Sequence, residues 1–174
     1  GRRNMAWAGT GIGRLGLWWQ ARRAGVPDGA APPDIPPGGG PLLLVQVSPD
    51  ARAAFAQVQR RLMRKRPDLR ILDAGDPGPA VAEALMGADP AALLLLGSDL
   101  PPALILAAAR RSLPIILAEA RFAPEDSGWT LRASARRELV RQIRAILVTD
   151  PASQAIALRM GADRRRVTMT GPVA

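Results

Sequence analysis

The chain alternates short apolar runs with segments that favour helices. Residues 92–96 (ALLLL) are wholly apolar and are followed at once by the turn residues GSD. A run this short is typical of a strand that is buried on both faces of a parallel sheet. The proline pair at 101–102 suits the first turn of a helix, and the arginine pair at 110–111 suits its last turn. A second apolar run follows at 114–118, so the sequence predicts a strand, a helix and a second strand here.

The same alternation extends over the chain from residue 42 onwards. It predicts an α/β fold, with a Rossmann-like parallel sheet of about six strands and helices on both faces. We expect strands at 42–47, 70–74, 92–96, 114–118, 145–149 and 167–170, and helices at 49–65, 79–86, 101–111, 132–143 and 152–160.

The first 41 residues have a different character. Residues 14–24 mix Leu and Trp with Arg, which is typical of a short amphipathic segment that packs on a domain or lies at a membrane interface. Residues 26–41 are rich in Pro and Gly and read as a connector. We therefore divide the chain into an N-terminal amphipathic segment with its linker, 1–41, and a Rossmann-like domain, 42–174.

Polar residues gather where the predicted strands end, which is where open α/β sheets bind their ligands. Ser48 and Asp50 follow the first strand, Asp99 follows the third, and Glu119 and Arg121 follow the fourth. Ser48, Asp99, Glu119 and Arg121 are therefore candidate substrate-binding residues. Asp50 and Asp99 are the candidates for a catalytic carboxylate.

Several of these residues also have a purely structural interpretation. Ser48 can cap the helix that follows it, and Asp99 can cap the next helix instead of binding a sugar hydroxyl. Arg121 can hold an anion through two parallel hydrogen bonds, or it can pair with a neighbouring carboxylate. The neighbouring carboxylates are Glu119, Glu125 and Asp126.

The chain carries a net charge of +9, and its densest basic stretch is the segment 60–66 (RRLMRKR). This stretch either attracts an anionic glycolipid or a membrane surface, or is simply the solvated face of a helix. No aromatic residue interrupts it, so we do not expect a nucleic acid partner. Because the chain has no His and no Cys, a metal site would rest on carboxylates alone, and we expect neither a metal nor a cofactor.

Two stretches carry a resemblance to a known family. GSDLPPA at 97–103 and LPIILAEARFA at 113–123 resemble, in order and spacing, the E-x-E-L-W-P-N and I-P-v-v-L-x-N-A-R-L-S motifs of the 3-deoxy-D-manno-octulosonic acid (Kdo) transferases. Residues 158–171 resemble that family's L-x-x-L-G-a-x-x-x-r-v-x-v-t-G, and residues 41–72 resemble its first strand, first helix and R-x-P-D-L-R-I-L. The similarity spans roughly Gly13 to the last residue.

The chain departs from the family at the residues that the family uses for chemistry. The first strand of the family ends in H-x-x-S-V-G-E, and the glutamate of this signature is its proposed catalytic base. Aligned on Ser48, the histidine position is Val45 and the glutamate position is Ala51. In the stretch that resembles E-x-E-L-W-P-N, Gly97 replaces the first glutamate, and only Asp99 keeps a carboxylate.

The resemblance implies the N-terminal, acceptor-side lobe of a GT-B glycosyltransferase that transfers Kdo from CMP-Kdo to a lipid A precursor in lipopolysaccharide biosynthesis. A chain of 174 residues is too short for the two lobes of such an enzyme, so inactivity alone is expected, and whether the chain is an enzyme stays open. The implied partners are the anionic lipid A precursor or a membrane surface, and a donor-binding C-terminal lobe. The implied location is the cytoplasmic face of the bacterial inner membrane, or the cytoplasm. The alternative function is a catalytically silent scaffold or interaction protein at the membrane surface.

Overall fold

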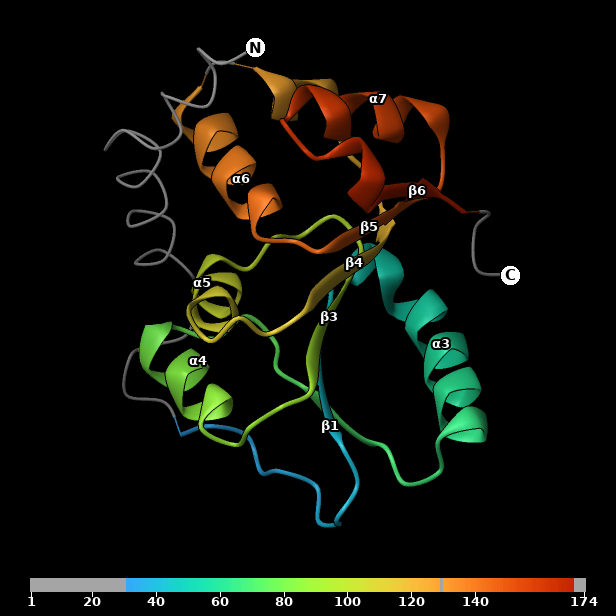
Figure 1. Cartoon of the computed structure of the whole chain (residues 1–174), viewed down its shortest axis with the longest axis vertical. Helices are drawn as coiled ribbons and strands as arrows, with labels where there is room; N and C mark the ends of the chain where they lie inside the picture. The colour runs from blue at the N-terminus through green and yellow to red at the C-terminus, as the bar shows by residue number, and fades with distance from the viewer. Residues whose placement is uncertain (1–30, 129, 171–174) are drawn as a thin grey trace.

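A single parallel sheet organises the part of the chain that the computed structural model describes, residues 31–128 and 130–170. Its six strands lie in the order β2-β1-β3-β4-β5-β6, with β2 and β6 at the edges (Figure 1). The strands are β1 (Leu42–Val47), β2 (Arg70–Asp73), β3 (Ala92–Leu96), β4 (Ile115–Ala120), β5 (Ala145–Val148) and β6 (Val167–Met169). The α/β, Rossmann-like fold expected from the sequence is confirmed.

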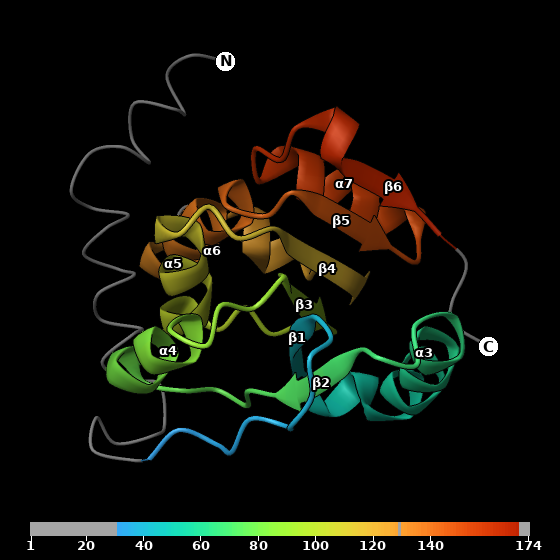
Figure 2. The ribbon, with the colours of Figure 1, turned by 60° about the horizontal axis from the view of Figure 1, so that its bottom comes forward.

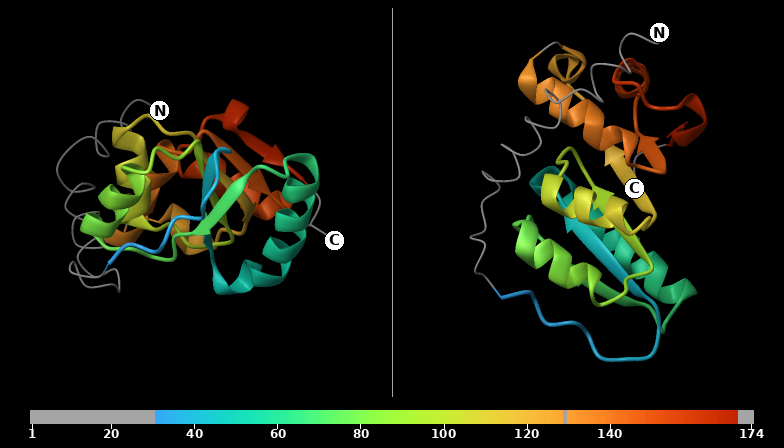
Figure 3. Two further views of the ribbon diagram at one scale, coloured as in Figure 1. Left: turned by 90° about the horizontal axis from the view of Figure 1, so that it is seen from below. Right: turned by 60° about the vertical axis from the view of Figure 1, so that its left-hand side comes forward.

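The helices are distributed unevenly over the two faces of the sheet. Helices α4 to α7 cover one face, whereas α3 lies on the other face (Figures 2 and 3). This follows from right-handed crossovers, because the chain moves from β1 to β2 in one direction and from β2 through β6 in the other. The helices are α3 (Arg52–Lys65), α4 (Pro79–Met86), α5 (Pro102–Arg110), α6 (Leu131–Arg141) and α7 (Pro151–Arg159), and the 3-10 turns are η1 (Pro49–Ala51), η2 (Pro124–Ser127) and η3 (Arg164–Arg166).

The central strands are buried on both sides, which explains their uninterrupted apolar sequences. In β1, Leu44 belongs to the larger core beneath α4 to α7, and its neighbour Val45 belongs to the smaller core beneath α3. In β3, Leu95 and Leu96 divide in the same way. Side chains alternate between the two faces of a strand, so both faces must be apolar where helices cover both.

The two cores differ in how well their helices are packed. Helices α4, α5, α6 and α7 each bury several side chains completely, but α3 buries none. Phe55, on the inner side of α3, is only partly buried against the smaller core. The larger core therefore carries most of the hydrophobic stabilisation of the described fold.

The first predicted helix, 49–65, is two elements in the structure. The 3-10 turn η1 comes first, and α3 starts only at Arg52. Ala51, the last residue of η1, breaks the helix because its backbone is not α-helical, with φ −110° and ψ 6°. The other predicted helices and strands lie within a few residues of their observed bounds.

Residues 31–41 run without helix or strand, as the connector interpretation predicts. This segment is attached to β2 because the guanidinium of Arg70 donates to the carbonyls of Gly40, at 2.8 Å, and Pro36, at 3.2 Å. The predicted amphipathic segment at 14–24 lies outside the described residues, and the division at residue 41 stays a prediction. Within the described part of the chain, no helix combines the length and the apolarity that crossing a bilayer requires.

Helix α7 begins at a charged cap. The carboxylate of Asp150 accepts hydrogen bonds from the backbone N–H of Ser153 at 2.7 Å and from the Ser153 hydroxyl at 3.0 Å. These hydrogen bonds, the backbone one first, hold the pKa of Asp150 below its ordinary value. The charged carboxylate therefore favours the folded state.

We expect Asp150→Ala to lower the free energy of unfolding at neutral pH, and this difference to shrink as the pH falls below about 4. A pKa that is lowered in the folded state stabilises above the unfolded pKa, and the stabilisation is lost as the pH falls through the folded pKa. Urea unfolding across this pH range measures the effect, with Asp150→Asn as the variant that can still cap but carries no charge. A difference that stayed constant into strong acid would contradict a charged cap.

Candidate functional site

The carboxyl ends of β1 and β3 form the topological switch point of the sheet. The chain leaves β1 through α3 towards β2, and it leaves β3 through α5 towards β4 on the other side. Open α/β sheets bind ligands at such a point, where two loops diverge. The loops here are 48–51, after β1, and 97–101, after β3.

Ser48 joins these two loops. Its side chain is completely buried, at 0% exposure, and its Oγ accepts a hydrogen bond of 2.9 Å from the backbone N–H of Asp99. The backbone N–H of Ser48 donates to the carbonyl of Leu96 at 2.8 Å, which extends the pairing of the two strands by one residue. Ser48 therefore fixes the start of the 97–101 loop.

A second contact between the two loops joins Ser98 to Asp50. The hydroxyl of Ser98 donates to the Asp50 carboxylate at 3.0 Å. Between the two contacts lies Gly97, with φ +102°, where an added Cβ would stand 2.6 Å from the Cβ and the Oγ of Ser48. Only glycine fits this backbone and this space.

Both capping interpretations from the sequence are wrong. Ser48 makes no side-chain cap to η1, because its hydroxyl is taken by the backbone of Asp99. Asp99 does not cap α5, whose N-cap residue is Pro101 and has no side-chain cap. Asp99 lies two residues before the N-cap position of α5, and its side chain stays exposed at the carboxyl ends of the strands.

The exposed Asp99 has a second carboxylate near it. Asp76, in the loop between β2 and α4, has a raised pKa, first because of its partial burial and then because of the negative charge of Asp99. The structure thus brings the loop after β2 to the same site. Across the described residues, no group of three or more acidic side chains could hold a metal ion.

Glu119 does not lie in a loop, as the sequence reading expected, but in β4 itself. It is 9% exposed, and its backbone is left-handed at φ +54°. The pairing of β4 with β5 is irregular between Leu117 and Ala120, so Glu119 sits in a bulge. Such a backbone is uncommon outside glycine and is often found beside functional sites.

Arg121 is exposed just beyond β4 and lies close enough to Asp150 to contribute to the low pKa of that carboxyl. It takes part in none of the ion pairs found in residues 31–128 and 130–170, so the predicted pairing with Glu119, Glu125 or Asp126 does not form. The carboxylate of Asp126 is instead paired with Arg136 at 2.8 Å.

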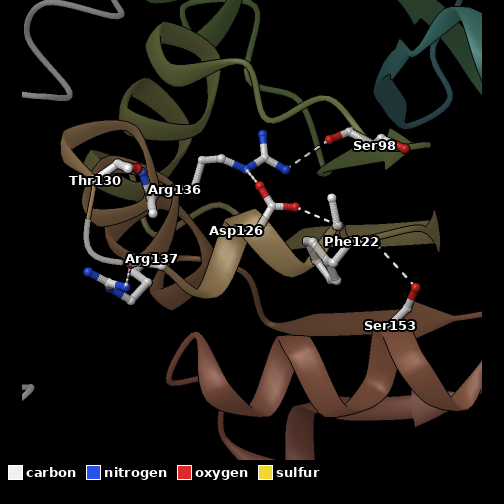
Figure 4. Close-up of polar contacts among 10 residues, drawn as sticks. Ser98, Phe122, Asp126, Thr130, Arg136, Arg137 and Ser153 are labelled. Carbon is white, nitrogen blue, oxygen red and sulfur yellow. Dashed lines mark hydrogen bonds and ion pairs between the residues drawn. The ribbon is translucent and has the colours of Figure 1, made fainter.

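Arg136, on α6, is the residue that sequence reasoning missed. Figure 4 shows its guanidinium between Asp126 and Ser98, to whose carbonyl it donates at 3.2 Å. Its side chain is only 11% exposed and that of Asp126 13%. Burial lowers the pKa of Arg136, and Asp126 opposes this effect. A sequence signal existed, because Arg136 follows the buried Ala133 by three positions and precedes the buried Val140 by four.

The loop after β4 is held by two hydrogen bonds at its start. The N–H of Ala123 donates to Asp126 at 2.9 Å, and the N–H of Phe122 donates to the Ser153 hydroxyl at 3.2 Å (Figure 4). Through Asp126, Arg136 connects this loop with Ser98 and so with the switch point. The edge therefore presents exposed Asp99 and Arg121 on a fixed framework, suited to hydrogen-bonding hydroxyls and an anionic group.

Comparisons with known proteins give one informative match. Residues 41–173 match the model of the N-terminal domain of 3-deoxy-D-manno-octulosonic-acid transferase (kdotransferase). No curated protein matches the chain. Among solved structures, the chain is similar to an N-formylmaleamic acid deformylase from Pseudomonas putida at 14% identity and a TM-score of 0.42, over 79% of this chain and 86% of that one. The resemblance read from the motifs is confirmed by the family match.

We expect Gly97→Ala to lower the free energy of unfolding by about 3 kcal/mol, from backbone strain and the clash with Ser48. Gly75→Ala is the matched control, since Gly75 also has a positive φ, +61°, but an added Cβ there meets nothing within 4 Å. The control should lose only about 1 kcal/mol. Equal losses in urea unfolding would contradict the close approach of the two loops.

We expect Arg136→Met to lower the free energy of unfolding by about 3 kcal/mol, because it leaves the Asp126 carboxylate buried without its cation. Adding Asp126→Asn should restore part of the loss, as a double-mutant cycle in urea would measure. The exposed pair of Arg66 with Asp68, at 3.1 Å, is the control, and Arg66→Met should change little. Strict additivity of the two changes would contradict the coupling.

Proposed function

This chain belongs to the 3-deoxy-D-manno-octulosonic-acid (Kdo) transferase family, and we propose that it is the acceptor-side lobe, binding a lipid A precursor at the carboxyl edge of β1, β3 and β4. Family membership supports a role in Kdo transfer in lipopolysaccharide biosynthesis. The finer statement rests chiefly on one observation. The candidate residues Ser48 and Asp99, far apart in the sequence, are in direct contact at the switch point.

In this proposal the exposed Asp99 carboxylate accepts a hydrogen bond from an acceptor hydroxyl. Asp50 is the second candidate for a catalytic carboxylate, but it already accepts from the Ser98 hydroxyl at 3.0 Å. The framework of Ser48, Ser98 and Arg136 supports Asp99 by fixing the backbone of its loop. Neither carboxylate stands at the position of the family's proposed base, which is occupied by the buried Ala51.

Arg121 contributes the binding of an anionic group, such as a phosphate of the glycolipid. It is exposed at the same edge, and its guanidinium can offer two parallel N–H donors. Glu119 acts on Arg121 through the backbone, because the left-handed conformation of Glu119 determines how the chain leaves β4. A phosphorylated acceptor would place this lobe at the cytoplasmic face of the inner membrane.

The second candidate function is a catalytically silent scaffold at the membrane surface. It is favoured by Ala51, which is 4% exposed and offers no base at the family's catalytic position. No His or Cys is present in the chain to replace it. This candidate keeps the family's fold and loses its turnover.

We expect saturable binding of a detergent-dispersed lipid A precursor, weakened about tenfold by Arg121→Ala and by Asp99→Asn, as calorimetry would measure. Arg144→Ala is the control, because Arg144 is exposed just before β5, at the amino ends of the strands and away from the proposed site. Binding that is no stronger than to a plain acidic detergent, or that Arg144→Ala weakens equally, would contradict the acceptor site.

A transfer assay separates the two candidates. Kdo transfer from CMP-Kdo to the precursor is measured with this chain alone and with a separately expressed C-terminal lobe of the family. Transfer in the supplemented reaction, abolished by Asp99→Asn or Asp50→Asn, would support an active acceptor lobe. Binding of the precursor without transfer in either reaction would support the silent scaffold.

A further inference from the structure

Helix α3 is a strongly basic element without any acidic residue. It carries Arg or Lys at positions 52, 60, 61, 64 and 65, and Arg66 follows directly. Its last turns therefore concentrate positive charge next to the negative end of the helix dipole. The described part of the chain has no other helix of this kind, since α4 and α6 contain glutamate and α5 and α7 carry a single basic residue each.

Acidic neighbours form ion pairs with residues at both ends of this basic element. Arg52 pairs with Asp73 at 3.0 Å, and Arg66 pairs with Asp68 at 3.1 Å. Within the described residues, Arg60, Arg64 and Lys65 take part in no ion pair. Three positive charges thus remain uncompensated on the second half of the helix.

An apolar side chain lies among these charges. Met63 is 39% exposed and lines the same stretch of surface as Arg60 and Arg64. With Gln59 these residues line a shallow, open hollow of about 430 Å³ on the outer surface of the helix. Arginine stems lie along apolar surface while their guanidinium groups reach outward.

The helix presents this surface away from the fold. Its inner side is formed by Phe55, Val58 and Leu62, which are half-buried towards the sheet. Figures 1 and 2 show α3 standing apart from α4, α5 and α6, on the opposite face of the sheet. On the outer surface of the second half of the helix, the side chains are exposed at Gln59, Arg60, Met63, Arg64 and Lys65.

We propose that the outer surface of α3, formed by Gln59, Arg60, Met63, Arg64 and Lys65, docks on an anionic phospholipid bilayer. The charges complement the lipid headgroups, and Met63 enters the interfacial region between them. Nucleic acid fits this surface less well, because none of the five residues has an aromatic ring on which a base could stack. This docking surface is separate from the carboxyl edge and does not depend on the acceptor site proposed there.

The test is sedimentation of the full chain with vesicles of phosphatidylcholine alone or with one third phosphatidylglycerol, at low and high salt. We expect binding only to the anionic vesicles, weakened by salt. The triple variant Arg60→Gln, Arg64→Gln and Lys65→Gln should reduce the partition coefficient about 100-fold. Met63→Gln should reduce it several-fold while leaving the net charge unchanged.

The control removes the same number of charges beside β6, the edge strand at the other side of the sheet from β2. Arg159, Arg164 and Arg165 are exposed on α7 and η3, next to the edge strand β6, and are replaced by Gln together. This variant should bind anionic vesicles nearly as well as the original chain, and circular dichroism checks that both triple variants are folded. Equal losses in the two triple variants, binding to neutral vesicles, or binding to duplex DNA in place of vesicles would each overturn the proposal.

Discussion

The close approach of Ser48 to Gly97 is the constraint on which the carboxyl edge depends, that is, the loops at the carboxyl ends of β1, β3 and β4. A buried hydroxyl accepts from the backbone of Asp99, and a glycine with a left-handed backbone leaves room for it. If either residue were larger, the two loops would have to separate, and neither Asp50 nor Asp99 would keep its position. The approach therefore depends on Gly97, which stands where the resemblance to the family places a glutamate.

Arg136 extends this constraint across the sheet. A cation that is nearly buried is stabilised only where its partners are fixed, and here they are a carboxylate from η2 and a carbonyl from the loop after β3. Helix α6 thereby positions two loops that come from strands earlier in the chain. The loops at this edge are thus supported by long-range polar contacts more than by their own turns.

Most of the fold could be predicted from the sequence, because a strand buried on two faces must be apolar at successive positions, as in residues 92–96. The site was predictable only in part. Ser48 and Asp99 were identified by their place after strands, but their mutual hydrogen bond spans 51 positions, and local capping rules gave the wrong partner for each. Arg136 was missed because arginine at a buried helix position needs a partner that only the tertiary structure supplies. Glu119 was identified as a candidate, but its place within β4 was not predicted, because a bulge leaves no local pattern.

The uneven layering of the sheet also has a kinetic consequence. Helix α3 buries no side chain completely, whereas each helix on the other face is anchored by several. Its amide protons should therefore exchange with solvent through a partial opening in which α3 detaches and the six strands stay paired. The protein would then consist of two cooperative units, a rigid one that holds the carboxyl edge and a looser one formed by a single helix.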